Sequence, residues 1–154
     1  MKWYQAVPDP LPDRRVWVQW NGLIEAIPVR EGRYGVAMLE ALDRQRNAPA
    51  FGWLEWDVAP DNDDLLKMES FAKQIEYRQV VTCHVPLYPV STGGSQFNDY
   101  SRGFSCVVFP TAFLFEHRES IAQLRYPTAD ADFFKLTLPA VCQDASPKHL
   151  HQWV

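Results

Sequence analysis

The sequence predicts one α+β domain, and three observations support this prediction. A tight-turn dipeptide, Asn21-Gly22, separates two strand-like segments near the start of the chain. From Phe51 to Val141, β-rich segments alternate with segments of helical periodicity. The 154 residues suffice for one domain with its own core, and no repeat or linker divides them.

The composition argues against several classes of protein. The net charge is −4, and no run of basic residues is present, which disfavours nonspecific binding to nucleic acid. Charged residues or prolines interrupt every apolar stretch well before the ~20 residues that a membrane span requires. We therefore expect a cytoplasmic protein with no membrane partner. The three cysteines lack metal-ligand spacing and are expected to be buried, reduced thiols, so no metal or other cofactor is predicted.

The N-terminal third of the chain is expected to add three features to the core. Residues 1–13 contain Pro8, Pro10 and Pro12 and are expected to form an extended arm on the surface. Residues 15–29 should form a β-hairpin. Val36 to Asp43 has helical spacing, with Asn47 and Pro49 after it.

Residues 51–141 are expected to form the core of the domain. Strands are predicted over 51–58, 78–85, 103–109 and 133–141, and helices over 61–75 and 110–124. The order βαββαβ predicts a ferredoxin-like arrangement, which is an antiparallel sheet with two helices on one face. Residues 86–102 should form a long loop.

Acidic residues offer one candidate for catalysis. Asp61, Asp63 and Asp64 lie where a helix begins and are explained as caps and dipole partners. Glu55 and Asp57 share one face of a strand, as two carboxylates do in a metal or acid/base site. With His84 they constitute our third hypothesis, a small carboxylate-dependent hydrolase or nuclease.

Histidines and a glycine-rich segment supply other residue types that active and binding sites use. Cys83 and His84 are neighbours on a strand and point to opposite faces, so they cannot activate each other. His149 and His151 have a chelating spacing, but a frayed C-terminus is the simpler expectation. The segment from Ser91 to Ser95 lacks the lysine of a phosphate-binding loop.

The segment from Arg102 to Phe109 resembles the RNP1 signature of RNA-recognition motifs. It falls on the third strand of the predicted βαββαβ core. The resemblance implies that Phe104 stacks on a base, helped by Arg102 and by Trp53 on a neighbouring strand. Cys106 stands where that family has a second aromatic residue. RNA binding is therefore our second hypothesis.

The hairpin suggests a different function. Its register leaves Trp17, Ile24 and Ala26 on a mixed face that must be covered by another element or by a partner. Tryptophan is common at the centre of protein interfaces. Self-association through this face is equally compatible with the pattern.

The sequence thus favours a non-enzymatic interaction protein that binds another macromolecule, with a protein as the first choice. Such a protein would act as a regulator or inhibitor of a larger assembly, like those that phages and mobile elements encode. The expected partner-binding residues come from the hairpin and the long loop: Trp17, Ile24, Tyr88, Phe97, Tyr100 and Arg102.

Overall fold

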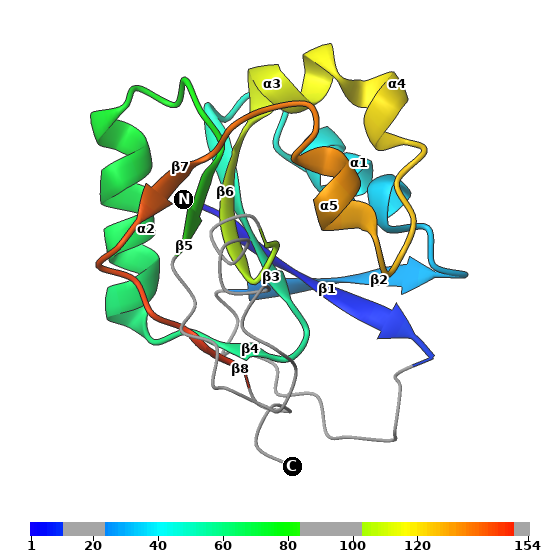
Figure 1. Ribbon diagram of the computed structural model, residues 1–154, viewed down its shortest axis with the longest axis horizontal. Coiled ribbons are helices and arrows are strands. Elements are labelled where there is room, and N and C mark those ends of the chain that lie inside the picture. Colours follow the sequence, from blue (N-terminus) through cyan, green and yellow to red (C-terminus); the bar gives the residue numbers. More distant parts are fainter. Residues whose placement is uncertain (11–23, 84–102, 150–154) are drawn as a thin grey trace.

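A computed structural model describes residues 1–10, 24–83 and 103–149 of the chain. A central six-stranded sheet separates α2 on one side from the other helices on the opposite side (Figure 1). The predicted α+β class is confirmed by this mixed sheet and its helices.

The sheets are built from eight strands in the described residues. They are β1 (Trp3–Asp9), β2 (Ile24–Arg30), β3 (Ala50–Glu55), β4 (Val58–Ala59), β5 (Val81–Cys83), β6 (Cys106–Pro110), β7 (Ala140–Cys142) and β8 (Lys148–His149). The order in the large sheet is β2-β1-β3-β6-β5-β7, and β4 pairs with β8 in a small second sheet. All strands of the large sheet run in one direction except β6, which is antiparallel to both of its neighbours.

Five helices connect these strands in the described part of the chain. They are α1 (Tyr34–Arg44), α2 (Asn62–Gln74), α3 (Thr111–Glu116), α4 (Arg118–Ile121) and α5 (Ala129–Phe133). The predicted helix over 110–124 is therefore divided into α3 and α4. The predicted strand over 133–141 is wrong at its start, because α5 ends at Phe133 and β7 covers only Ala140–Cys142.

The prediction of a surface arm over residues 1–13 is wrong for Trp3–Asp9. This segment is β1, which pairs in parallel with β2 on one side and with β3 on the other. Trp3 and Tyr4 are almost completely buried. Their burial stabilises an internal strand, and Pro8 is tolerated because it comes near the strand's end. Residues 11–13 lie outside the described residues.

The predicted hairpin can be compared with the structure only in its second half. Ile24–Arg30 is a strand, as expected, but the neighbour seen in the structure is β1, in parallel. The first strand and the Asn21-Gly22 turn lie outside the described residues, as does the loop over 86–102.

The ferredoxin-like arrangement is not confirmed. In that arrangement the last strand lies beside the first strand of the βαββαβ core. Here β1 already occupies that side of β3, and β7 pairs with β5, in parallel, at the far edge. The two predicted helices also lie on opposite faces of the sheet, not on one face.

Two hydrophobic clusters, one on each face of the sheet, form the core. The cluster beneath α2 contains Met68 and Ala72, with Leu65, Phe71 and Ile75 partly buried against it. These residues recur three or four positions apart in the sequence, as on one face of a helix. In α1 the buried face includes Met38 and Ala41, whereas Val36 is 48% exposed.

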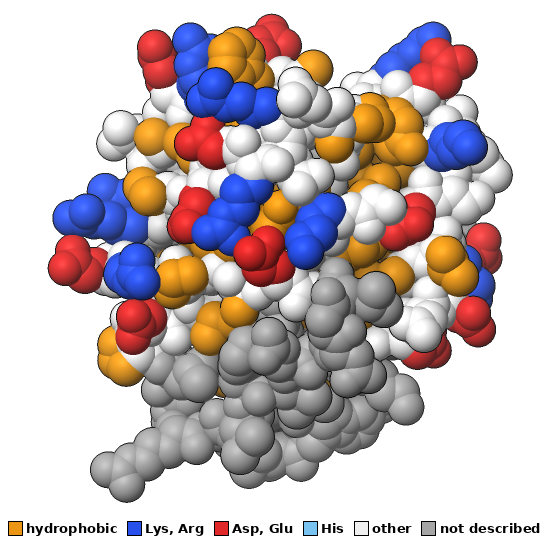
Figure 2. All heavy atoms as spheres, turned by 180° about the vertical axis from the view of Figure 1, so that it is seen from behind, with side chains coloured by type: hydrophobic (Ala, Val, Ile, Leu, Met, Phe, Trp, Pro, Cys, Tyr) orange, Lys and Arg blue, Asp and Glu red, His pale blue; other side chains and the backbone are white. Residues whose placement is uncertain are grey.

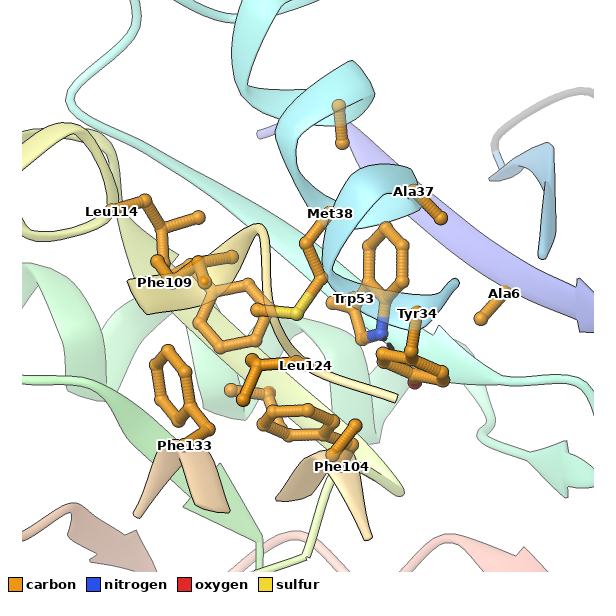
Figure 3. Packing of buried hydrophobic residues seen from close by; sticks show 14 of the residues in the cluster. Ala6, Tyr34, Ala37, Met38, Trp53, Phe104, Phe109, Leu114, Leu124 and Phe133 are labelled. Atoms are coloured by element: carbon orange, nitrogen blue, oxygen red, sulfur yellow. Dashed lines mark hydrogen bonds between the residues drawn. The ribbon is translucent and has the colours of Figure 1, made fainter. Parts of the chain in front are cut away.

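The other cluster is strongly aromatic (Figure 3). Phe104 lies at its centre, stacked on Tyr34 with 5.5 Å between ring centroids. It also meets Phe109 and Phe133 edge-on. These contacts attach the β2–α1 and α5 segments to the start of β6.

The acidic residues at the start of α2 cap the helix, as predicted. The Asp61 carboxylate accepts a hydrogen bond from the Asp64 backbone N–H at 2.7 Å, and the Asp64 carboxylate accepts one from the Asp61 N–H at 3.1 Å. Asp64 also accepts a hydrogen bond from the Ser146 backbone N–H at 2.9 Å. The cap therefore joins the start of α2 to the C-terminal segment.

A close contact between Trp3 and Gly52 fixes the position of β1 on β3. The two residues are register partners, and the Trp3 indole lies across the α-carbon of Gly52. A β-carbon at position 52 would lie 2.0 Å from the ring atom Cδ2. The Trp3 indole N–H also donates to the Glu69 carboxylate of α2 at 2.8 Å. Only glycine admits this arrangement.

We predict that Gly52→Ala lowers the free energy of unfolding by about 1–3 kcal/mol, because the indole must move. Chemical denaturation of the single and double variants provides the measurement. In a Trp3→Ala background the same substitution should cost much less. An equal cost in both backgrounds would mean that the indole is not the obstacle.

Candidate functional site

The candidate site lies at the carboxyl end of β3, where β1 and β2 also end. The chain passes from β1 to β2 on one side and then crosses to β3 on the other side of β1. The strand order therefore reverses between β1 and β3. In open α/β sheets, ligands bind outside the carboxyl ends of the strands at such a reversal.

Glu55, the last residue of β3, has an unfavourable environment for a charged carboxylate. Its side chain is partly buried, and no described residue donates a hydrogen bond to it or pairs with it as a cation. Burial, followed by the nearby carboxylates of Asp57 and Asp130, raises the pKa of Glu55 from 4.5 to about 8. At neutral pH this carboxyl group therefore holds a proton in the free protein.

Two more carboxyl groups lie near Glu55: that of Asp57, two residues further along the chain, and that of Asp130, from a distant part of the chain. Asp57 lies between β3 and β4 and is 6% exposed. Asp130 lies in the first turn of α5, where its Oδ1 accepts a hydrogen bond from the Ala131 backbone N–H at 2.8 Å. Burial raises the pKa of Asp130 despite this bond. Three carboxyl groups thus share one poorly hydrated region.

Two tyrosines border the carboxyl groups, one buried and one exposed. The buried Tyr34 hydroxyl accepts a hydrogen bond from the Trp53 indole N–H at 2.8 Å (Figure 3). Burial and then the charge of Glu55 raise the pKa of Tyr34 well above 10. Tyr126 is 56% exposed, and burial of its hydroxyl, followed by Glu55 and Asp57, raises its pKa too.

The small sheet brings the C-terminal segment to the same region. His149 in β8 is the register partner of Val58, the residue after Asp57. The expectation of a frayed C-terminus is therefore wrong as far as His149, while His151 lies outside the described residues. Over the parts that the structure describes, no group of three or more His, Cys, Asp and Glu residues is arranged to hold a metal ion by itself.

The residues predicted to stack on RNA are buried in the core. Trp53 is 0% exposed and Phe104 is 1% exposed, and both belong to the aromatic cluster. The RNP1-like segment lies on β6, an internal strand with a hydrophobic cluster on each face. The assignment of Trp53 and Phe104 as base-stacking residues is therefore wrong, because helices cover the face that an RNA-recognition motif leaves open. Arg102 lies outside the described residues.

Of the predicted partner-binding residues, only Ile24 is described. It is 3% exposed and packs in the cluster beneath α2, so it is not a surface contact. Trp17, Tyr88, Phe97, Tyr100 and Arg102 lie outside the described residues. Binding of a protein partner through them stays a prediction.

The expectation that the cysteines are buried, reduced thiols is confirmed. Cys83, Cys106 and Cys142 are buried free thiols. His84 lies outside the described residues. The face in Figure 2 intersperses acidic and basic side chains without a continuous basic patch over its described part. None of the helices in the described ranges is long and apolar enough to cross a membrane.

Comparison with known proteins gives no further guide to the site. The sequence matches no protein-family model and no curated protein.

The sequence pattern pairs Glu55 with Asp57 but gives no indication of Asp130, Tyr34 or Tyr126. Asp130 and Tyr126 are more than 60 residues from Glu55 in the chain. The packing of α5 against Phe104 places Asp130, and the hydrogen bond to the Gly32 carbonyl places Tyr126. A local pattern does not reveal them.

We predict that Glu55→Gln removes a pH dependence of stability. Below pH ~4.5 the wild type and the variant should be equally stable, because Glu55 is then neutral in both the folded and unfolded chains. As the pH rises towards about 8, only the unfolded chain ionises, and the wild type loses stability relative to the variant. We expect a difference on the order of 2–4 kcal/mol at pH 9 by urea denaturation.

The matched control is Glu116→Gln, which alters an exposed carboxylate on α3. It should leave the pH profile unchanged. A Glu55→Gln profile parallel to that of the wild type would contradict the raised pKa.

Proposed function

We propose that this protein is a carboxylate-dependent enzyme that hydrolyses or transfers a phosphate ester or anhydride of nucleotide type with the help of a divalent cation. The observation that carries the proposal is the Glu55 carboxyl group, which is partly buried near Asp57 and Asp130 and has no donor or cation among the described residues. Strongly perturbed carboxyl groups of this kind cluster at active sites.

A cation is one of two ways to relieve the repulsion among these carboxyl groups. Without it, Glu55 keeps its proton. Mg²⁺ and Mn²⁺ prefer oxygen ligands, and Mg²⁺ is usually held by one or two carboxylates together with substrate phosphates instead of by a complete protein cage. A Mg²⁺ site of this kind does not need three protein ligands. It is therefore compatible with the described residues, in which no three His, Cys, Asp or Glu side chains are arranged to hold a metal ion.

Glu55 and Asp57 would hold the cation, because they come from the end of β3 and the turn that follows it. A bound cation would neutralise charge on the phosphate oxygens. Burial, together with Asp57 and Asp130, keeps the pKa of Glu55 high in the free protein, so that cation binding must displace the Glu55 proton. The Tyr34 and Trp53 side chains are buried and hydrogen-bonded to each other, and they would help to exclude water from this region.

The position of the carboxyl groups supports a nucleotide-type substrate. They lie at the carboxyl end of a mostly parallel sheet, next to the reversal of strand order between β1 and β3. Nucleotide cofactors bind at this place in open α/β sheets. The proposal departs from the non-enzymatic function favoured by the sequence and takes up its third hypothesis, without His84. Cytoplasmic location fits such a substrate.

Isothermal titration with Mn²⁺ and pyrophosphate tests the proposal. We expect Mn²⁺-dependent binding that strengthens from pH 6.5 to pH 8.5, as the Glu55 proton becomes easier to displace. Glu55→Gln and Asp57→Asn should weaken it at least about tenfold, the effect of losing ~1.4 kcal/mol of binding energy. Glu116→Gln again provides the control.

The contrary result is binding that is absent, or that ignores both Mn²⁺ and the Glu55→Gln substitution. In that case the interaction-protein hypothesis is the stronger one, and affinity capture with wild type and Trp17→Ala becomes the next experiment.

A further inference from the structure

Tyr126 is an exposed aromatic residue at the edge of the sheet where the carboxyl groups lie. It follows α4 in the chain, and it is 56% exposed to solvent although its side chain is a large ring. It belongs to neither hydrophobic cluster, so the core does not explain its position. Its backbone hydrogen-bonds to Gly32, which follows β2, and the carboxyl ends of β2 and β3 lie at the same edge of the sheet.

The backbone of Tyr126 is held firmly at this position. Its N–H donates to the Gly32 carbonyl at 2.8 Å, and the same carbonyl accepts a hydrogen bond from the Tyr34 N–H at 2.9 Å. The β2–α1 turn therefore anchors both tyrosines through one acceptor. Nearby, the Gly35 N–H donates to the Leu124 carbonyl at 3.1 Å, which ties the start of α1 to the segment before Tyr126.

This junction is closely packed. A β-carbon at Gly35 would lie 1.6 Å from the carbonyl oxygen of Ile121, so α1 and α4 approach as nearly as glycine permits. The exposed ring of Tyr126 thus extends from a rigid support. A rigid aromatic ring loses little conformational entropy when a ligand stacks on it.

We propose that Tyr126 is a specificity residue whose ring stacks on the base of a nucleotide held at the carboxyl site. The inference rests on the proposed function. Carboxylates and a cation recognise phosphates but do not distinguish a nucleotide from pyrophosphate. An exposed aromatic ring at the rim supplies that distinction, because base stacking is favourable and tolerates different bases.

The ring and the hydroxyl of Tyr126 make separable contributions. Stacking needs the ring alone, so Tyr126→Phe should keep nucleotide binding and Tyr126→Ala should lose it. If Tyr126 instead acts by a hydrogen bond from its hydroxyl, Tyr126→Phe should be as defective as Tyr126→Ala.

The experiment compares the Mn²⁺-dependent affinities of pyrophosphate and of uridine, adenosine and guanosine diphosphates by isothermal titration. The wild type should bind at least one diphosphate about tenfold or more tightly than pyrophosphate. Tyr126→Ala should reduce that affinity to the pyrophosphate level without weakening pyrophosphate binding. Phe115→Ala is the matched control, since Phe115 is a 54% exposed aromatic residue on α3.

The outcomes separate this inference from the function on which it rests. If pyrophosphate and the diphosphates bind equally, or if Tyr126→Ala behaves like the wild type, the role of Tyr126 is refuted and the proposed function stands. If none of these probes binds in a Mn²⁺-dependent manner, both are refuted. A selective loss in Tyr126→Phe would refute stacking in favour of the hydroxyl.

Discussion

The insertion of β1 between β2 and β3 is the constraint on which the rest of the structure depends. It requires Gly52, because the Trp3 indole lies across that residue and then reaches Glu69 on α2. Once β1 is in place, three parallel strands end at one edge, and Glu55 comes to lie at a reversal of strand order. The same insertion blocks the side of β3 that a ferredoxin-like sheet gives to its last strand, so β7 pairs with β5.

Local signals in the sequence predicted the elements better than their arrangement. The cap at Asp61 and Asp64, the buried face of α2 and the β2 segment follow from nearest-neighbour chemistry. The face of the sheet that each helix covers does not follow from such local chemistry. The crossovers β2–α1–β3 and β3–α2–β5 advance in the same direction across the sheet, and right-handed crossovers would place both helices on one face. Because α1 and α2 lie on opposite faces, the two crossovers have opposite hands.

The candidate site was predictable only in part, for a related reason. Glu55 and Asp57 are two residues apart, and their pairing is visible in the sequence. Asp130 and Tyr126 depend on the packing of α5 and on the Gly32 carbonyl, which are long-range features. Phe104 shows the opposite error: a motif-like segment resembled an RNA-binding strand, yet its aromatic residue fastens α5 to the sheet. The burial of Phe104 thus helps to bring Asp130 to Glu55.

The central claim is that Glu55 is a carboxyl group kept protonated by burial and by its neighbours until a cation replaces the proton. The most direct measurement is a ¹³C NMR titration of the Glu55 carboxyl carbon, assigned with Glu55→Gln, in the absence and presence of Mg²⁺ and pyrophosphate. The account predicts a midpoint near pH 8 in the free protein and a much lower midpoint with both additives present. A midpoint near pH 4.5 in the free protein, or no change on adding Mg²⁺ and pyrophosphate, would contradict it.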